Sequence, residues 1–205
     1  MTRLLLASRN AKKLIELQRV VDAAGIVGVQ VIGLDAVPEF PEVPETGATF
    51  EENALIKARS GAQEAGLPCL ADDSGLAVDA LNGMPGVLSA RWSGRHGDDA
   101  ANNALLLAQV SDVPDDRRGA AFVSACALVL PDGTETVVRG EWRGTILTAP
   151  RGENGFGYDP LFVPDDAAAD GRTSAELTGA EKDSLSHRGK ALAQLVPAIS
   201  ELASS

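Results

Sequence analysis

Two adjacent acids, Asp72 and Asp73, interrupt an otherwise apolar stretch of the chain, between Leu67–Leu70 and Leu76–Val78. An ionised carboxylate is costly to bury unless a metal, a cation or hydrogen bonds compensate it. Because neighbouring side chains on a strand point to opposite faces, one site would meet mainly one of the two acids. The pattern predicts a metal ligand or general base at a strand end, where Ser74-Gly75 lets the chain turn. A plain polar turn is the alternative.

A second polar group, Ser8-x-Asn10-x-x-Lys13, follows the short apolar run 4–7 and opens a helical pattern. The N-terminus of a helix attracts anions through its unpaired N–H groups and its dipole. A hydroxyl, an amide and an ammonium at this point therefore suggest phosphate binding, although neither the P-loop nor the dinucleotide-binding motif is present. A solvated helix start is the alternative.

Lys57 and Glu45 are further candidates for contacts with phosphate or metal. Lys57 falls on a predicted helix, four residues after Asn53 and therefore on the same face. Its alternative is a lysine that extends along apolar neighbours to water. Glu45 lies in a proline-rich loop, where plain loop charge is the alternative to a metal ligand.

The segment Gly155-Phe156-Gly157-Tyr158-Asp159-Pro160 suggests recognition of a planar ligand. Phe156 can present its ring between two glycines that allow close backbone approach. Asp159 is held extended by the following proline. A tight turn with core aromatics is the alternative.

Ser186-His187-Arg188-Gly189 places a histidine beside an arginine at a predicted helix start, with Lys182 shortly before it. A cap or surface histidine is the alternative there. The other histidine, His96, is expected at the surface of a glycine-rich loop.

Hydrophobic periodicity supplies the elements that would position these residues. The opening order of strand, loop, helix and strand indicates an α/β fold. Thr49 and Glu52 have the spacing of a helix capping box, and Pro197 is expected to kink or end the last helix. Strands are predicted at 4–7, 29–32, 67–78 (with its turn), 120–130, 135–142 and 161–163, and helices at 11–24, 50–65, 100–110 and 186–202.

Length and charge limit the possible functions of the chain. Its 205 residues suffice for one large domain. A formal net charge of -11 disfavours a nucleic-acid or anionic-membrane partner, but a small phosphorylated ligand needs only a local cationic patch.

The two cysteines, Cys69 and Cys126, are far apart in the sequence, and each lies in an apolar run. This placement predicts buried, reduced thiols. Without a signal-peptide pattern or a membrane-length apolar run, a cytoplasmic location is expected.

Taken together, the motifs occur in an order that resembles the inosine triphosphate pyrophosphatase family, the non-canonical purine nucleoside triphosphate (dITP/XTP) pyrophosphatases. The resemblance runs from Ser8 to the final helix. Its departures are small, with Ser8 where threonine is also common and Asn154 where glycine is frequent. The motifs are Ser8-x-Asn10-x-x-Lys13, Thr49-Phe50-x-Glu52-Asn53-Ala54, Ala71-Asp72-Asp73-Ser74-Gly75-Leu76, Gly86-Val87-x-Ser89-Ala90-Arg91, Gly155–Pro160 and Ser186–Gly189.

This resemblance implies Mg²⁺-dependent hydrolysis of (deoxy)inosine and xanthosine triphosphates to the monophosphate and pyrophosphate, which would cleanse the nucleotide pool of deaminated purines. It also implies a homodimer whose subunit is an elongated α/β fold. In that fold a long mixed sheet is flanked by helices, and the active site lies in the cleft between two lobes. The whole chain, residues 1–205, would form a single pyrophosphatase domain.

The resemblance also assigns roles to residues. Asp73 would be the proton acceptor and a Mg²⁺ ligand. We expect Glu45 to be the second ligand and Asp72 a supporting acid, with Asp72 as the alternative second ligand. Because adjacent carboxylates titrate as a coupled pair, the choice between the two aspartates is open at this point. Phe156 would stack on the purine. The residues expected around the edge of the base are Tyr158, Asp159, Lys182, His187 and Arg188. The expected substrate-binding residues are Ser8, Arg9, Asn10, Ala11, Lys12, Lys13, Lys57, Ser74, Phe156, Gly157, Tyr158, Asp159, Lys182, His187 and Arg188.

Two other functions are compatible with parts of this pattern. Maf-like nucleotide pyrophosphatases share a related architecture, but they are not expected to carry the motifs at 155–160 and 186–189 together. A nucleotide-binding sensor without turnover would not need Asp72, Asp73 and both lysines.

Overall fold

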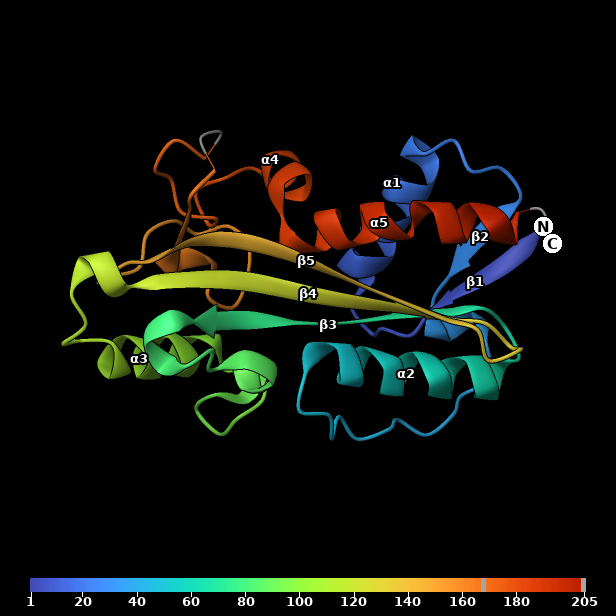
Figure 1. Cartoon of the computed structure of the whole chain (residues 1–205), viewed down its shortest axis with the longest axis horizontal. Coiled ribbons are helices and arrows are strands. Elements are labelled where there is room, and N and C mark those ends of the chain that lie inside the picture. The colour runs from blue at the N-terminus through green and yellow to red at the C-terminus, as the bar shows by residue number, and fades with distance from the viewer. Residues whose placement is uncertain (167–168, 204–205) are drawn as a thin grey trace. The chain divides into compact units, whose positions relative to one another are not determined.

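The strands of the protein form one mixed sheet. The computed structural model describes residues 1–166 and 169–203. Within them the strands are β1 (Thr2–Leu6), β2 (Val29–Ile32), β3 (Cys69–Val78), β4 (Gly119–Val129), β5 (Glu135–Ile146) and β6 (Phe162–Pro164). They are arranged in the order β2-β1-β3-β4-β5-β6 (Figure 1). β1 is parallel to β2 and β3, whereas β5 and β6 are antiparallel, which confirms the predicted α/β class with a mixed sheet.

The helices follow the predicted pattern with one addition. They are α1 (Ala11–Ala23), α2 (Phe50–Ala65), α3 (Asp99–Gln109), α4 (Gly179–Leu185) and α5 (His187–Leu202). The short helix α4 was not predicted, although Thr178 and Glu181 form a complete capping box at its start. Pro197 lies inside α5, which continues to Leu202, so the expected early end is wrong. None of the helices in the described ranges combines the length and the apolar character that crossing a membrane requires.

The chain divides into two compact units, and three strands contribute residues to both. The first unit consists of residues 1–73 and 124–140 and of the chain from 188 onward. The second consists of residues 74–123, 141–166 and 169–187. Each unit has its own buried apolar cluster.

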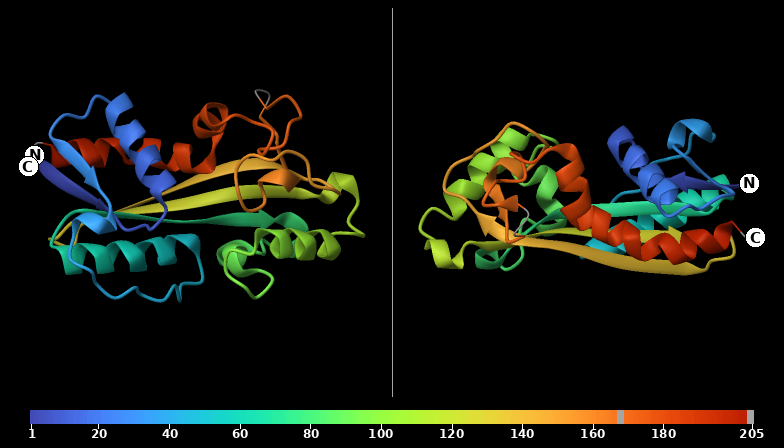
Figure 2. Two further views of the ribbon diagram at one scale, coloured as in Figure 1. Left: turned by 180° about the vertical axis from the view of Figure 1, so that it is seen from behind. Right: turned by 90° about the horizontal axis from the view of Figure 1, so that it is seen from above.

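In the first unit, helices cover both faces of the strands. Helices α1 and α5 lie on one face and α2 on the other (Figures 1 and 2). Leu17 of α1 and Leu195 of α5 are fully buried against Leu4 and Leu70 of the strands. The predicted apolar stripe of α1 therefore faces the core.

Helix α2 lies unusually close to the sheet. Thr49 caps its first turn by accepting a hydrogen bond from Glu52 N, and Gly66 ends it in the left-handed conformation. The side chain of Glu52 accepts from Ala48 N rather than from Thr49 N, so the predicted capping box is only half formed. A Cβ added to Gly61 would overlap Sγ of Cys69 on β3. Glycine is thus required at this helix position by packing.

The second unit packs α3 against the remaining parts of the strands. Leu106 of α3 and Val110, the C-cap of that helix, share a buried cluster with Leu76 of β3 and Phe122 of β4. The other face is covered by the segment around β6 and by α4 (Figure 1). This segment contains the aromatic loop at 155–160.

The acidic pair lies in the interior of a strand. β3 runs without interruption from Cys69 to Val78, so Asp72 and Asp73 do not stand at a strand end. The turn expected at Ser74-Gly75 is absent, and the polar-turn alternative is wrong as well. β1 pairs with β3 only at Cys69 and Leu70, so β4 is the neighbouring strand that accompanies β3 beyond them.

The contact between α2 and β3 predicts an unusual response to the change Gly61→Ala. In an exposed helix interior this change stabilises by about 1 kcal/mol, because alanine is the better helix former. Here the new methyl group must displace Cys69, and overpacking of this kind costs about 1–3 kcal/mol. We expect a lower midpoint of urea unfolding for Gly61→Ala and almost no change for Gln63→Ala, an exposed site on the same helix. A stabilised Gly61→Ala protein would contradict the close contact.

Candidate active site

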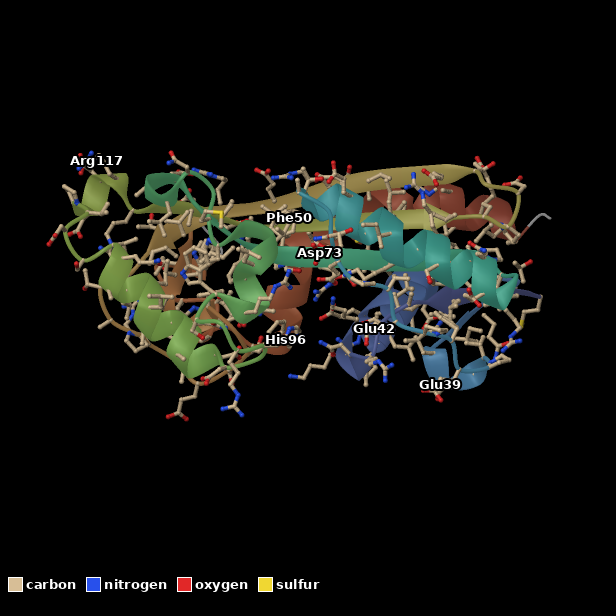
Figure 3. The ribbon with its side chains drawn as sticks, turned by 90° about the horizontal axis from the view of Figure 1, so that it is seen from below. Glu39, Glu42, Phe50, Asp73, His96 and Arg117 are labelled. Atoms are coloured by element: carbon tan, nitrogen blue, oxygen red, sulfur yellow. The ribbon has the colours of Figure 1, made fainter. Side chains whose placement is uncertain are left out.

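Asp72 and Asp73 lie on opposite faces of β3, and each meets a different set of side chains. Leu70 packs in the cluster formed with α1 and α5, and Asp72, two residues later, points to the same face. Asp73 points to the face covered by α2. In Figure 3 Asp73 is seen from the α2 side, near the start of that helix at Phe50. The alternation predicted for the two acids is therefore what the structure has.

Asp72 is buried and held by two cations. Its Oδ2 lies 2.7 Å from Lys13 Nζ and 3.2 Å from Arg188 Nη2. Burial alone would raise the pKa of this carboxyl, but Lys13 and Arg188 outweigh it and hold the pKa far below its usual range. Asp72 is therefore a fixed negative charge that aligns Lys13 and Arg188.

Arg188 makes contacts different from those expected. Its guanidinium also donates to Glu16 Oε2 of α1 at 3.1 Å, so this arginine belongs to the charged cluster of the first unit. The expected position beside the residues around Phe156 is not supported by any of these contacts. His187, its neighbour in sequence, is buried in the second unit and stacks on Phe122 with ring centroids 5.2 Å apart.

Asp73 is partly shielded from solvent, and its negative charge is compensated less strongly than that of Asp72. Asn53 Nδ2 donates to its Oδ2 at 3.1 Å, and Lys57 Nζ lies 3.6 Å from its Oδ1. The side chain is 12% exposed. Burial raises the pKa of Asp73 above its ordinary value despite the opposing effect of Lys57. A carboxylate with a raised pKa and some access to solvent is suited to accept a proton.

Helix α2 and the loop before it arrange the groups around Asp73. Asn53 and Lys57 share one face of α2, as their spacing predicted. Asn53 Oδ1 accepts from Gly47 N at 2.8 Å, which fixes the orientation of the amide toward Asp73. Lys57 Nζ also lies 2.6 Å from Glu45 Oε1, so this one ammonium contacts both carboxylates.

The first loop uses most of its polar groups to start α1. Asn10 Oδ1 accepts from Lys12 N, and Ser8 Oγ accepts from Asn10 N at 3.2 Å. Lys12 and Arg9 are exposed, and Ala11 is the first residue of the helix. Lys13 is the residue of this motif whose side chain reaches the acidic pair.

The donor set fits a divalent metal only with help from a substrate. In the part of the chain that the structure describes, no three acids, histidines or cysteines converge as a metal cluster. Asp73 and Glu45, however, converge on the ammonium of Lys57. Mg²⁺ is commonly bound by one or two carboxylates, with phosphate oxygens and waters completing its shell. These two residues could therefore hold the ion beside a phosphorylated ligand.

In the second unit, the aromatic loop exposes one ring above a buried ion pair. The Phe156 side chain is half exposed, and Lys182 Nζ lies 5.0 Å from its ring centroid. The same ammonium pairs with the buried carboxylate of Asp159 at 2.5 Å. Asp159 also accepts from Phe156 N at 2.8 Å and from Ser174 Oγ at 2.9 Å. Asp159 therefore organises the loop from within.

Tyr158 of the same loop also has an internal partner. Tyr158 is buried and donates from its hydroxyl to Ser89 O at 2.9 Å. Ser74 is a partly buried residue within β3. The contacts of Tyr158 and Asp159 do not support the expected positions at the edge of a base, and their part in binding stays a prediction.

Several residues of these clusters were missed as candidates. Glu16, Ser174, Asp99 and Asn103 have partners far away in sequence, which no local pattern indicates. Asn53 had a signal, because its spacing from Lys57 placed both on one face of α2.

The family model of the Ham1 family matches residues 4–198. The chain belongs to the Ham1 family. A relative from Nocardia farcinica named dITP/XTP pyrophosphatase is 72% identical over 99% of this chain and 97% of its own length. One from Mycobacteroides abscessus with the same name is 66% identical over 98% of this chain and 96% of its own.

Solved Ham1 structures share the fold of this chain. A nucleoside-triphosphatase / dITP/XTP pyrophosphatase from Mycobacterium abscessus has a TM-score of 0.81 and 67% identity, covering 97% of this chain and 100% of that one. A HAM1 protein from Coxiella burnetii has a TM-score of 0.87 and 41% identity, covering 98% and 100%. The predicted resemblance and fold class are therefore confirmed.

The different environments of the two acids predict stability losses of different size when each is replaced in this Ham1 protein. Asp72→Asn leaves Lys13 and Arg188 without their shared carboxylate, and loss of one partner of a buried ion pair costs about 3–5 kcal/mol. Asp73→Asn should cost much less, because the fold disfavours the ionised form of Asp73. Urea unfolding at pH 7 measures both changes.

The pH dependence of stability follows from the direction in which folding shifts the pKa of each aspartate. The pKa of Asp72 is lower in the folded state, so its contribution is present at neutral pH and is lost as pH falls below about 4. The difference in the free energy of unfolding between wild type and Asp72→Asn should therefore become smaller as the pH is lowered. The raised pKa of Asp73 works against the folded state at neutral pH. Equal losses for both variants at pH 7 would contradict this account.

Proposed function

We propose that this chain is a nucleoside triphosphate pyrophosphatase that hydrolyses dITP, ITP, XTP and dXTP to the monophosphate and pyrophosphate. The observation that carries the proposal is the environment of Asp73, a shielded carboxylate of raised pKa beside Asn53 and Lys57. The shared name of relatives that match along nearly their whole length supports the choice of reaction.

Asp73 accepts a proton from the water that attacks the α-phosphorus. Its raised pKa brings it closer to the working pH of a general base. Asn53, fixed by Gly47 N, keeps the carboxylate oriented. The reaction itself needs positioning and charge stabilisation more than covalent chemistry.

Cations of the first unit bind the triphosphate in this proposal. Lys13 and Lys57 contact phosphate oxygens, and the loop of Ser8, Arg9, Asn10, Ala11 and Lys12 lines the phosphate site at the start of α1. Asp72 remains ionised and keeps Lys13 and Arg188 in place. Asp73 and Glu45 would hold Mg²⁺, which when bound would neutralise charge on the phosphate oxygens.

Residues of the second unit recognise the base in this proposal. The exposed Phe156 ring stacks on the purine, and Lys182 donates to a 6-oxo group. Adenine has a 6-amino donor there, which leaves a polar group mispaired at a cost of about 1–3 kcal/mol. Gly157, Tyr158, Asp159 and His187 shape and hold this region.

The proposal extends to the biological context. The whole chain, residues 1–205, acts as one catalytic domain in a cytoplasmic homodimer, and its net charge of -11 disfavours binding to nucleic acid. Its role is removal of deaminated purine nucleotides from the pool.

A hydrolysis panel tests the reaction directly. The wild-type protein is incubated with dITP, XTP, GTP or ATP, with Mg²⁺ or with EDTA, and the products are identified. Monophosphate and pyrophosphate from dITP and XTP, only with the metal, are expected. Release of single phosphates would contradict the reaction type, and binding without turnover would indicate a nucleotide sensor instead.

We predict that Asp73→Asn lowers kcat for dITP by about 10²- to 10⁴-fold, the usual contribution of a general base. The fold should remain intact, because burial disfavours the ionised form of this carboxylate. Asp112→Asn, which changes an exposed acid of the second unit, is the matched control and should leave kcat unchanged. Near-normal turnover by a folded Asp73→Asn protein would exclude Asp73 as the base.

Lys182→Ala and Arg188→Ala should affect substrate choice differently. Lys182 lies at the Phe156 ring, so its loss should lower the preference for XTP over ATP by about tenfold or more. Arg188 contacts Asp72, so its loss should lower kcat/KM for all substrates alike. Measurement of kcat/KM for ITP, XTP, GTP and ATP with each variant distinguishes the two roles. A change of preference only in Arg188→Ala would reverse the two assignments.

A further inference from the structure

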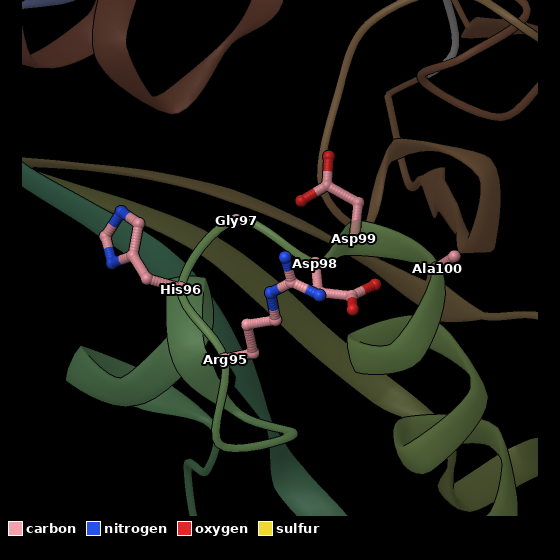
Figure 4. A pocket seen from close by; sticks show the side chains of 6 residues that line it. All are labelled: Arg95, His96, Gly97, Asp98, Asp99 and Ala100. Carbon is pink, nitrogen blue, oxygen red and sulfur yellow. The ribbon is translucent and has the colours of Figure 1, made fainter.

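Helix α3 holds the peptide that follows the exposed aromatic ring. Asp99 Oδ2 accepts a hydrogen bond from Gly157 N at 2.7 Å, and Asn103 Nδ2 donates to Gly157 O at 2.8 Å. The two side chains are four residues apart and therefore project from one face of the helix. Figure 4 shows Asp99 at the start of α3, where it borders a hollow lined by residues 95–100.

These hydrogen bonds act at a flexible point of the chain. Gly155 and Gly157 have φ angles of +82° and +62°, so the backbone on both sides of Phe156 lacks the restraint of a side chain. Asp159 binds the N–H of Phe156, and Asp99 binds the N–H of the next residue. Both ends of Phe156 are therefore tied, and its half-exposed ring is held in one orientation beside Lys182.

The side-chain oxygen of Asn103 is in an unfavourable position, which packing alone does not explain. Its Oδ1 is buried and has no hydrogen-bond partner among the residues that the structure describes. A buried acceptor without a partner is unfavourable for stability. The amide is instead oriented by its Nδ2 donor, which faces Gly157 O. An asparagine at this position therefore holds the loop through its Nδ2, while its own Oδ1 has no hydrogen-bond partner among the described residues.

We propose that Asp99 and Asn103 are positioning residues that preform the Phe156 ring as a platform for the purine base. The proposal rests on the proposed function, because it assigns the ring to the base of the nucleotide. It adds α3, which no sequence motif indicated, to the determinants of base recognition. Asp99 and Asn103 act through Gly157 and do not themselves need to touch the substrate.

The test compares Asp99→Ala, Asp99→Asn and Asn103→Ala with wild type and with the control Asp112→Ala. One measurement is steady-state hydrolysis of dITP and of ribose triphosphate, which lacks a base. The other is calorimetric binding of IMP, which requires no turnover. Thermal unfolding identifies any variant that fails to fold.

We expect KM for dITP and the Kd for IMP to rise about tenfold in Asp99→Ala and Asn103→Ala, the size of a lost base–aromatic stack. kcat and the hydrolysis of ribose triphosphate should change less than about twofold, since stacking energy is not involved in them. Asp99→Asn keeps an acceptor for Gly157 N and should restore near-normal binding.

Three outcomes would overturn the proposal. One is unchanged IMP binding in folded Asp99→Ala and Asn103→Ala proteins. Another is an equal loss with dITP and ribose triphosphate, which would leave the proposed reaction intact. The third is a wild-type protein that binds no purine monophosphate. Absence of turnover together with normal IMP binding would instead refute the proposed function alone.

Discussion

The alternation of side chains along β3 is the constraint on which the charged groups around Asp72 and Asp73 depend. Two acids in sequence are forced to opposite faces of a buried strand, so they cannot share one environment. Asp72 meets Lys13 and Arg188, whereas Asp73 meets Asn53 and Lys57. The same pair of residues thereby yields one permanently charged anchor and one carboxylate with a raised pKa.

This arrangement assigns a separate support to each acid. Helices α1 and α5 carry the cations for Asp72, and α2 carries the partners of Asp73. The required closeness of α2 to the strand explains why Gly61 has no room for a side chain above Cys69. Packing in the core and geometry at the carboxylate are thus set by the same contact.

Sequence reasoning succeeded where local rules decide the structure. The cap at Thr49, the shared face of Asn53 and Lys57 and the strand at Val29–Ile32 all follow from short-range spacing. It failed at Ser74-Gly75, because pairing with neighbouring strands overrides turn propensity. Arg188 and His187, which one motif groups, belong to different units, and their part in binding the base stays a prediction. The bond from Gly157 to Asp99 spans 58 residues, and no local pattern could indicate it.

The balance of charge in the first unit gives a physical reason for the proposed metal. Three cations, Lys13, Lys57 and Arg188, are paired with four carboxylates, Glu16, Glu45, Asp72 and Asp73, which leaves a formal excess of one negative charge. A triphosphate approaching this cluster would be repelled rather than attracted at short range. A divalent cation on Asp73 and Glu45 would reverse the sign and release Lys57 for the phosphates. The pairing of these side chains is therefore a reason, in addition to the chemistry of the leaving group, to expect that the proposed reaction depends on a divalent metal.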